Sequence, residues 1–238
     1  MVPEMNRFRK SSSNIILIFT ALLILCSCCE VFFFDIKALL REHRLLIIVI
    51  ERLMMIIPIA LVIAIEGPDI IKRINFNKPK IFLSVFLGVG SVLLVLAYIF
   101  VCYKYFSGAH AYEWTLRELV DNVKNNFLVS LSLPWLFIKN ILNLFFVVAV
   151  IEEVFWRGIV QNLLEQSLRP WLAIIATSAL FGLWHIIYLT LMGYFPVLPM
   201  IYGIIFGAVY YKYRNIWYPV IIHFFVNWTQ NVLVHYLR

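Results

Sequence analysis

The residues with the clearest chemical potential are two adjacent glutamates that follow an apolar run. Glu152 and Glu153 come directly after Ile151, and Arg157 stands four positions after Glu153. Residues four apart share one face of a helix, so Glu153 and Arg157 are expected to pair. Glu152 is turned by about 100° from Glu153 and need not share that partner. One carboxylate is then neutralised, and the other stays available as a base.

Two further motifs with polar residues stand in apolar runs nearer the C-terminus. Phe181 precedes His185 by four positions, and His223 precedes Asn227 by the same spacing. Taken singly, each motif is explained as well by packing or by hydrogen bonds between helices as by catalysis. Taken together, they complete a set with the glutamates. A base, an imidazole that orients water and a pair of donors for an oxyanion are what peptide hydrolysis by activated water requires.

The composition indicates the solvent in which these groups work. The chain has 238 residues, of which 63% are hydrophobic and only 14% are charged, whereas an ordinary soluble domain has about 25% charged residues. The mean hydropathy is +0.90. These values exclude a soluble globular enzyme, a disordered protein and a nucleic-acid-binding module, because so much apolar surface needs lipid around it. We interpret the net charge of +7 as a set of topology signals and contacts with anionic lipid.

Seven apolar runs must position the polar residues. All but the sixth approach the roughly 20 residues that cross a bilayer, so the predicted class is all-α: a polytopic transmembrane bundle of about seven spans. Between the third and fourth runs, residues 107–127 are predicted to form an interfacial amphipathic helix. The first run resembles a signal peptide but is interpreted as a retained helix. The runs are Ile15–Phe34, Leu45–Ile65, Ile81–Tyr103, Leu136–Leu164, Trp171–Leu189, Val197–Tyr211 and Ile216–Tyr236.

The runs fall into two regions. Residues 1–130 are expected to hold N-terminal transmembrane helices and the interfacial segment, and residues 131–238 the helical catalytic core. In the short sixth run and just before it, Pro196, Pro199, Gly203 and Gly207 favour close backbone packing. A slight excess of basic residues in alternate connections favours a cytoplasmic N-terminus.

The polar motifs resemble those of a known family, the CPBP intramembrane proteases, which include the CAAX prenyl endopeptidases and the bacterial Abi proteins. The similarity covers roughly residues 136–232. It rests on three motifs in order and on their surroundings: Glu152-Glu153-x-x-x-Arg157, Phe181-x-x-x-His185 and His223-x-x-x-Asn227, with Arg157-Gly158, Phe206-Gly207 and the stretch from Asn215 to Pro219.

The resemblance implies a role for each residue in a cavity that opens to the cytosol. Glu152 would activate the water and His185 would help to orient it. The remaining roles are support and stabilisation: Arg157 would position the glutamates, Glu153 would support the site, Phe181 would pack beneath it, and His223 and Asn227 would stabilise the tetrahedral oxyanion.

The expected partners follow from the same resemblance. They are membrane lipid and a peptide or lipidated-protein substrate, with no nucleic acid. The expected location is the bacterial plasma membrane, with CAAX-type processing, peptide-pheromone or bacteriocin processing, or immunity as possible roles. No cofactor is expected, because a glutamate–histidine mechanism needs no metal and the chain has no HExxH motif. The alternative is a divalent metal such as zinc, held by Glu152, His185 and His223.

Two other classes of function compete with the protease. A catalytically silent scaffold would keep the motifs for packing alone. A proton-coupled transporter would use Glu30, Glu51, Glu152 and Glu153 as a relay, but the sequence shows no inverted repeat. In that part of the chain, Glu51 and its neighbour Arg52 are interpreted as a local pair or a mid-helix anchor.

Overall fold

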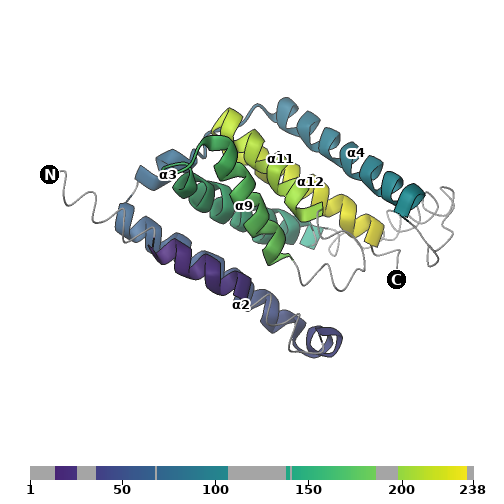
Figure 1. The fold of residues 1–238 in the computed structure, drawn as a ribbon, viewed down its shortest axis with the longest axis horizontal. Coiled ribbons are helices and arrows are strands. Elements are labelled where there is room, and N and C mark those ends of the chain that lie inside the picture. Colours follow the sequence, from purple (N-terminus) through teal and green to yellow (C-terminus); the bar gives the residue numbers. More distant parts are fainter. Residues whose placement is uncertain are drawn as a thin grey trace. The chain divides into compact units, whose positions relative to one another are not determined.

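We analysed a computed structural model of the chain, which describes residues 14–25, 36–67, 69–106, 138–139, 141–185 and 198–234 (Figure 1). Within these ranges all regular structure is helical and no strand occurs, which confirms the all-α class. The described helices belong to two compact units, which we treat separately. The first unit comprises Met1–Lys78 and Ile151–Pro219, and the second comprises Pro79–Val150 and Val220–Arg238.

The described residues of the N-terminal part of the first unit form three helices. The helix at 14–25 buries Ile16, Thr20 and Leu23 on one face. Helix α2 spans Ile36–Glu66 and ends at Gly67, whose φ of 69° suits glycine. The short helix α3, Asp69–Ile74, follows. The sequence analysis missed α3, because six residues are too few to show a helical period.

The C-terminal part of the first unit begins with a continuous helical stretch. It consists of α7 (Ile151–Glu153), the π-helical segment η2 (Val154–Gln161) and α8 (Asn162–Leu164). Helices α9, Pro170–Trp184, and α11, Leu198–Tyr213, complete the unit. Pro170 starts α9 at a position where its missing N–H costs nothing. π-Helical turns are rare and often mark functional sites.

Close packing of α9 against α11 depends on two glycines. A Cβ atom on Gly203 would lie 2.9 Å from the Cα of Ser178, and one on Gly207 would lie 3.1 Å from Cγ2 of Ile174. Ser178 and Ile174 are one turn apart on α9, as the glycines are on α11. The predicted close approach at Gly203 and Gly207 is therefore confirmed.

The connection between α11 and α12 (Trp217–Val234) is tied to the segment that follows α3. The Asn215 side chain donates to the Asn77 carbonyl at 2.7 Å and accepts a hydrogen bond from the Trp217 backbone N–H at 2.9 Å. The Trp217 indole N–H donates to the Phe76 carbonyl at 2.9 Å. Asn215 thus caps the start of α12 and fixes where it begins.

The second unit contains α4 (Ile81–Phe106), the π-helical segment η1 (Asn143–Val150) and most of α12. A Cβ atom on Gly88 of α4 would lie 2.6 Å from Cδ2 of Phe225 on α12. Phe145 of η1 meets Phe224 edge to face, with ring centroids 5.6 Å apart. Aromatic rings of α12 therefore contact both α4 and η1.

The predicted helical runs agree with the observed helices at the described residues except two. His185 of the fifth run and Ile216 of the seventh lie in turns, because α9 ends at Trp184 and α12 begins at Trp217. Within the described ranges, no helix combines the length and the apolar character needed to cross a membrane. The predicted interfacial segment at 107–127, residues 26–35 of the first run and residues 186–189 of the fifth run lie outside the described residues.

Candidate active site

Glu153 and Arg157 form a buried ion pair within the first unit. Both side chains have 0% relative exposure, and Arg157 Nε and Nη1 lie 3.2 Å from Glu153 Oε2 and Oε1, respectively. Arg157 also donates from Nη2 to the carbonyl oxygen of Gly203 on α11, at 3.2 Å. The predicted pairing at a spacing of four is confirmed. The contact between Nη1 and Oε1 is a hydrogen bond, and the approach of Nε to Oε2 adds attraction between opposite charges.

Two aromatic rings complete the surroundings of Arg157. Its Cζ lies 4.7 Å from the ring centroid of Phe181 and 5.3 Å from that of Phe206. Contacts of this kind favour a cation on an aromatic face. The Phe181 ring also lies 4.3 Å from the His185 ring. Phe181 therefore joins the arginine to the histidine, which agrees with its expected packing role.

Glu152 has an arginine of its own. Glu152 is 2% exposed, and its Oε1 lies 2.6 Å from Nη1 of Arg52, which is 12% exposed and belongs to α2. The expected difference between the two carboxylates is thus correct, since Glu152 does not share Arg157. Arg52 is a positive partner of Glu152 that the helical spacing did not predict. Arg52 stands 100 positions away in the chain, where helical spacing gives no information.

The sequence did contain one signal that pointed to Arg52. A charged residue inside an apolar run is costly and is usually retained for a reason. The sequence alone favours a local pair with Glu51, because neighbours on the same helix are the only partners that a single helix reveals. The contact with Glu152 needs α2 to lie against α7, as it does in the structure.

His185 lies at the C-terminal end of α9 and not inside a longer helix. Its backbone N–H bonds to the carbonyl oxygens of Phe181 and Gly182, and its ring Nδ1 lies 2.8 Å from the Phe181 carbonyl oxygen. A carbonyl only accepts, so Nδ1 carries the proton in this contact. In the neutral ring, Nε2 then holds the lone pair that can accept a proton from water.

Trp184 links His185 to the arginine of α2. Its ring centroid lies 4.4 Å from that of His185 and 5.8 Å from Cζ of Arg52. Trp184 is almost completely buried. Arg52, Glu152, Trp184 and His185 therefore form a continuous chain of contacts in the first unit.

His223 and Asn227 lie on α12 in the second unit. The His223 side chain is buried, and Asn227 is partly buried. Their four-residue spacing on one helix is confirmed. The structure describes each unit by itself, so their participation in one site with Glu152 stays a prediction.

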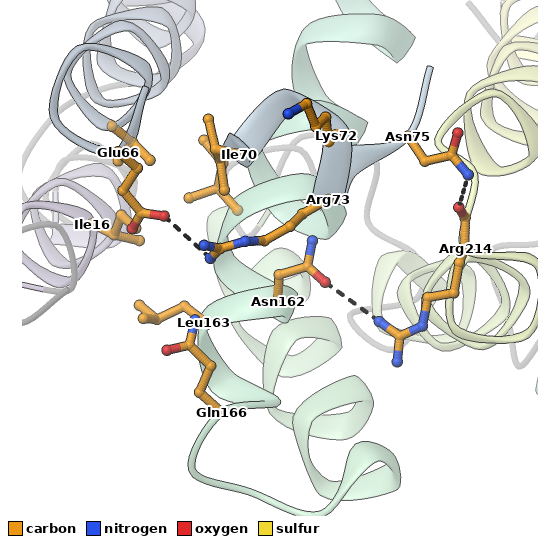
Figure 2. Close-up of a pocket in the computed structure, with 12 residues that line it drawn as sticks. Ile16, Glu66, Ile70, Lys72, Arg73, Asn75, Asn162, Leu163, Gln166 and Arg214 are labelled. Atoms are coloured by element: carbon orange, nitrogen blue, oxygen red, sulfur yellow. Dashed lines mark hydrogen bonds and ion pairs between the residues drawn. The ribbon is translucent and has the colours of Figure 1, made fainter. Parts of the chain in front are cut away.

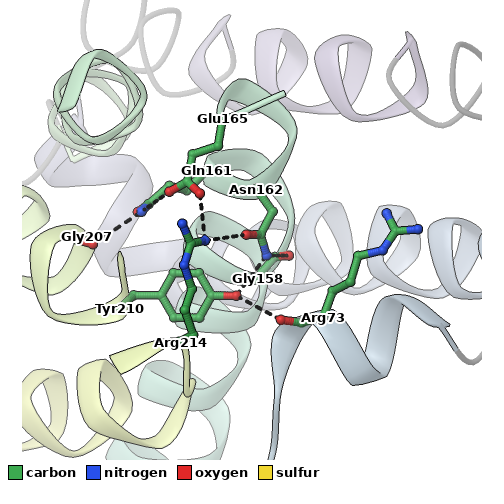
Figure 3. A network of polar contacts seen from close by, with 8 residues as sticks. All are labelled: Arg73, Gly158, Gln161, Asn162, Glu165, Gly207, Tyr210 and Arg214. Carbon is green, nitrogen blue, oxygen red and sulfur yellow. Dashed lines mark hydrogen bonds and ion pairs between the residues drawn. The ribbon is translucent and has the colours of Figure 1, made fainter. Parts of the chain in front are cut away.

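A second polar cluster in the first unit joins η2, α8 and α11 (Figure 3). Arg214 binds Glu165 at 2.6 Å, and Asn162 donates to the Tyr210 hydroxyl at 2.8 Å. Gln161 donates to Glu165 and to the Gly207 carbonyl oxygen, at 2.9 and 3.2 Å. These contacts link the helices that carry Arg157 and its partner Gly203.

A cavity of about 540 Å³ lies beside this cluster (Figure 2). Its lining includes the basic residues Lys72, Arg73 and Arg214, but none of the six proposed site residues. Each of the three cations has an acidic partner: Asp69 at 3.0 Å, Glu66 at 3.3 Å and Glu165 at 2.6 Å, respectively. The positive charge around the cavity is therefore compensated.

The possible ligands of a metal ion are His, Cys, Asp and Glu side chains. In the part of the chain that the structure describes, no three His, Cys, Asp or Glu side chains gather as metal ligands. Glu152, the first residue of the alternative zinc set, is paired with Arg52. The metal dependence of the reaction stays a prediction, because His223 of the alternative zinc set belongs to the second unit.

The C-terminal part of the chain is similar to a known family. Residues 133–229 match the family model described as Rce1-like, type II CAAX prenyl endopeptidase. This match confirms the resemblance that the motifs predicted, and it contains all six proposed site residues. Comparisons with curated proteins and with solved structures found no match. Arg52 lies outside the matched residues.

Proposed function

We propose that this chain is an intramembrane endopeptidase. The proposal starts from the match of residues 133–229 to the Rce1-like type II CAAX prenyl endopeptidase family model. The observation that carries the proposal is the pair of buried carboxylates at the first motif. Glu152 and Glu153 are held by different arginines, and contacts connect each of them to the region of His185. Two adjacent carboxylates in different surroundings can take different roles in one reaction.

In the proposed reaction Glu152 acts as the general base. It takes a proton from a water molecule while the water oxygen attacks the scissile carbonyl carbon, and it passes that proton to the departing amine. His185 orients the water through Nε2, because Nδ1 is engaged by the Phe181 carbonyl oxygen. His223 and Asn227 donate hydrogen bonds to the oxyanion. Glu153 and Arg157 keep the helix around Glu152 in place.

The proposed substrate is a membrane-associated peptide or protein. The family description points to a prenylated C-terminal Cys-aliphatic-aliphatic-X sequence. A peptide pheromone, a bacteriocin or a bacteriocin precursor would present a scissile peptide bond without a prenyl group. We also propose that the chain lies in the bacterial plasma membrane with its N-terminus in the cytoplasm. This location rests on the apolar composition and on the basic residues between the apolar runs.

The test replaces Glu152 by glutamine in the full chain. Cells with wild-type protein are compared with cells carrying Glu152→Gln at equal membrane abundance, and their membrane peptides are identified by mass spectrometry. We expect uncleaved precursors to accumulate only in the variant, because an amide cannot accept the proton of the water. Glu66→Gln is the matched control, since Glu66 pairs with Arg73 outside the proposed site.

The purified chain is then assayed on an internally quenched farnesylated peptide and on its unprenylated counterpart. Cleavage of the first alone identifies a CAAX-type substrate, and cleavage of both identifies a plain peptide bond as sufficient. Loss of cleavage in a chelator, restored by zinc, would replace the metal-free mechanism by the zinc alternative. Absence of cleavage by both proteins, with equal function of wild type and Glu152→Gln in cells, would instead leave a silent scaffold protein.

A further inference from the structure

Arg52, the largely buried arginine of α2, does not belong to the family motifs, which all lie in residues 133–229. Arg52 is nevertheless in direct contact with Glu152, with Nη1 and Oε1 2.6 Å apart. Both side chains are largely removed from solvent. Charged hydrogen bonds of this length are the strong ones. One carboxylate oxygen of the proposed base therefore has a fixed direction.

Arg52 has a second contact that leads to the proposed water-orienting residue. Its guanidinium lies 5.8 Å from the ring centroid of Trp184, and the Trp184 ring lies 4.4 Å from that of His185. Arginine suits both contacts at once, because its planar cation binds a carboxylate edge-on and stacks on an aromatic face. A lysine has one ammonium group and no such face.

We propose that Arg52 is a positioning residue, which holds Glu152 through the ion pair and His185 through Trp184. This inference rests on the proposed function, because it names what orients the base of that site. It assigns a part of the active site to α2, which lies outside residues 133–229 that carry the motifs. The chain 1–130 then contributes more than additional helices.

The physical reason for such a residue is geometric. Glu152 lies on α7 and His185 at the end of α9, so their separation depends on how two elements pack. Arg52 contacts the first directly and the second through one ring, and it thereby restrains both from a third helix. A misplacement of about 1 Å at reacting groups can lower a rate about 10²-fold.

The test measures kcat and KM of the purified full chain on the quenched farnesylated peptide. We expect Arg52→Gln to lower kcat about 10²-fold and to leave KM within about twofold, because the residue acts on the base and not on substrate binding. Arg52→Lys should give an intermediate kcat, since it keeps the charge but loses the planar contact with Trp184. Arg73→Gln is the control, because it removes a cation that pairs with Glu66, and it should keep the wild-type kcat.

A thermodynamic cycle tests the pair without using activity. Unfolding is measured for Arg52→Gln, Glu152→Gln and the double variant in detergent. We expect the double variant to be more stable than Arg52→Gln alone, because a buried carboxylate without its cation is costly. Additive effects of the two substitutions would contradict the pair. If Arg52→Gln does not fold, the kcat of Arg52→Lys decides.

The outcomes separate the two proposals. Full cleavage by Glu152→Gln would overturn the proposed function, whatever Arg52 does. If Glu152→Gln is inactive, the result for Arg52 decides the positioning role alone. That role is overturned if Arg52→Lys keeps the wild-type kcat, or if the kcat of Arg52→Gln equals that of Arg73→Gln.

Discussion

At the scale of single residues, two carboxylate–guanidinium pairs hold opposite charges in the interior of the first unit. Glu153 with Arg157 and Glu152 with Arg52 each place a carboxylate and a guanidinium away from solvent. The free-energy cost of removing two charges from water is recovered only with good geometry and further hydrogen bonds. Arg157 has these, in its two contacts to Glu153 and its hydrogen bond to Gly203. Removing one partner should therefore be far more damaging than removing both.

We predict that Arg157→Met lowers the free energy of unfolding by about 3 to 5 kcal/mol, because it leaves Glu153 buried without its cation. Adding Glu153→Gln to that variant should recover a large part of the loss. Denaturation of the purified protein in detergent, followed by tryptophan fluorescence, measures both values. Equal stability of the single and double variants would show that the pair does not contribute as described.

At the scale of elements, donors on η2 and acceptors on α11 have the same four-residue spacing. Arg157 and Gln161 are four apart on η2, and they donate to the carbonyl oxygens of Gly203 and Gly207, which are four apart on α11. The absence of side chains at these glycines lets α9 approach α11 closely. The helix that carries the proposed base is thereby fixed to its neighbours by hydrogen bonds and by close packing.

We predict that Gly203→Ala destabilises the protein by about 1 to 3 kcal/mol, since the new methyl group would meet the Cα and Cβ atoms of Ser178 in a packed interface. Gly90→Ala is the control. A Cβ atom on Gly90 meets nothing within 4 Å, and alanine favours a helix over glycine by about 1 kcal/mol. Thermal unfolding of both variants in the same detergent is the measurement, and a Gly203→Ala protein as stable as Gly90→Ala would contradict the packing.

At the scale of the whole molecule, apolar surface remains exposed in the described residues. Helix α4 presents Phe82, Phe86, Val89 and Leu93 along one face, and Phe82 is 90% exposed. Exposed apolar faces of this kind mark surfaces that meet a membrane or another protein. The composition of the chain, 63% hydrophobic, favours lipid as the partner of this face.

We predict that the full chain stays in the membrane pellet after alkaline carbonate extraction and is released by detergent, because its apolar surface needs lipid or detergent around it. Immunoblotting of the two fractions measures the distribution. A peripheral membrane protein and an established integral membrane protein of the same cells serve as controls. Release of the chain by carbonate alone would contradict an intramembrane protease.

The sequence by itself determined the helical class, most helix positions, the family resemblance and the Glu153–Arg157 pair. These follow from local periodicity, because residues four apart on a helix are neighbours wherever the helix lies. Only the tertiary structure decided that Glu152 binds Arg52, that Trp184 lies between Arg52 and His185, and that Gly203 accepts a hydrogen bond from Arg157. Such contacts join residues far apart in the chain, and their existence depends on which helix faces pack together. A linear pattern indicates which residues share a helix face, but the packing of one helix on another selects the partner.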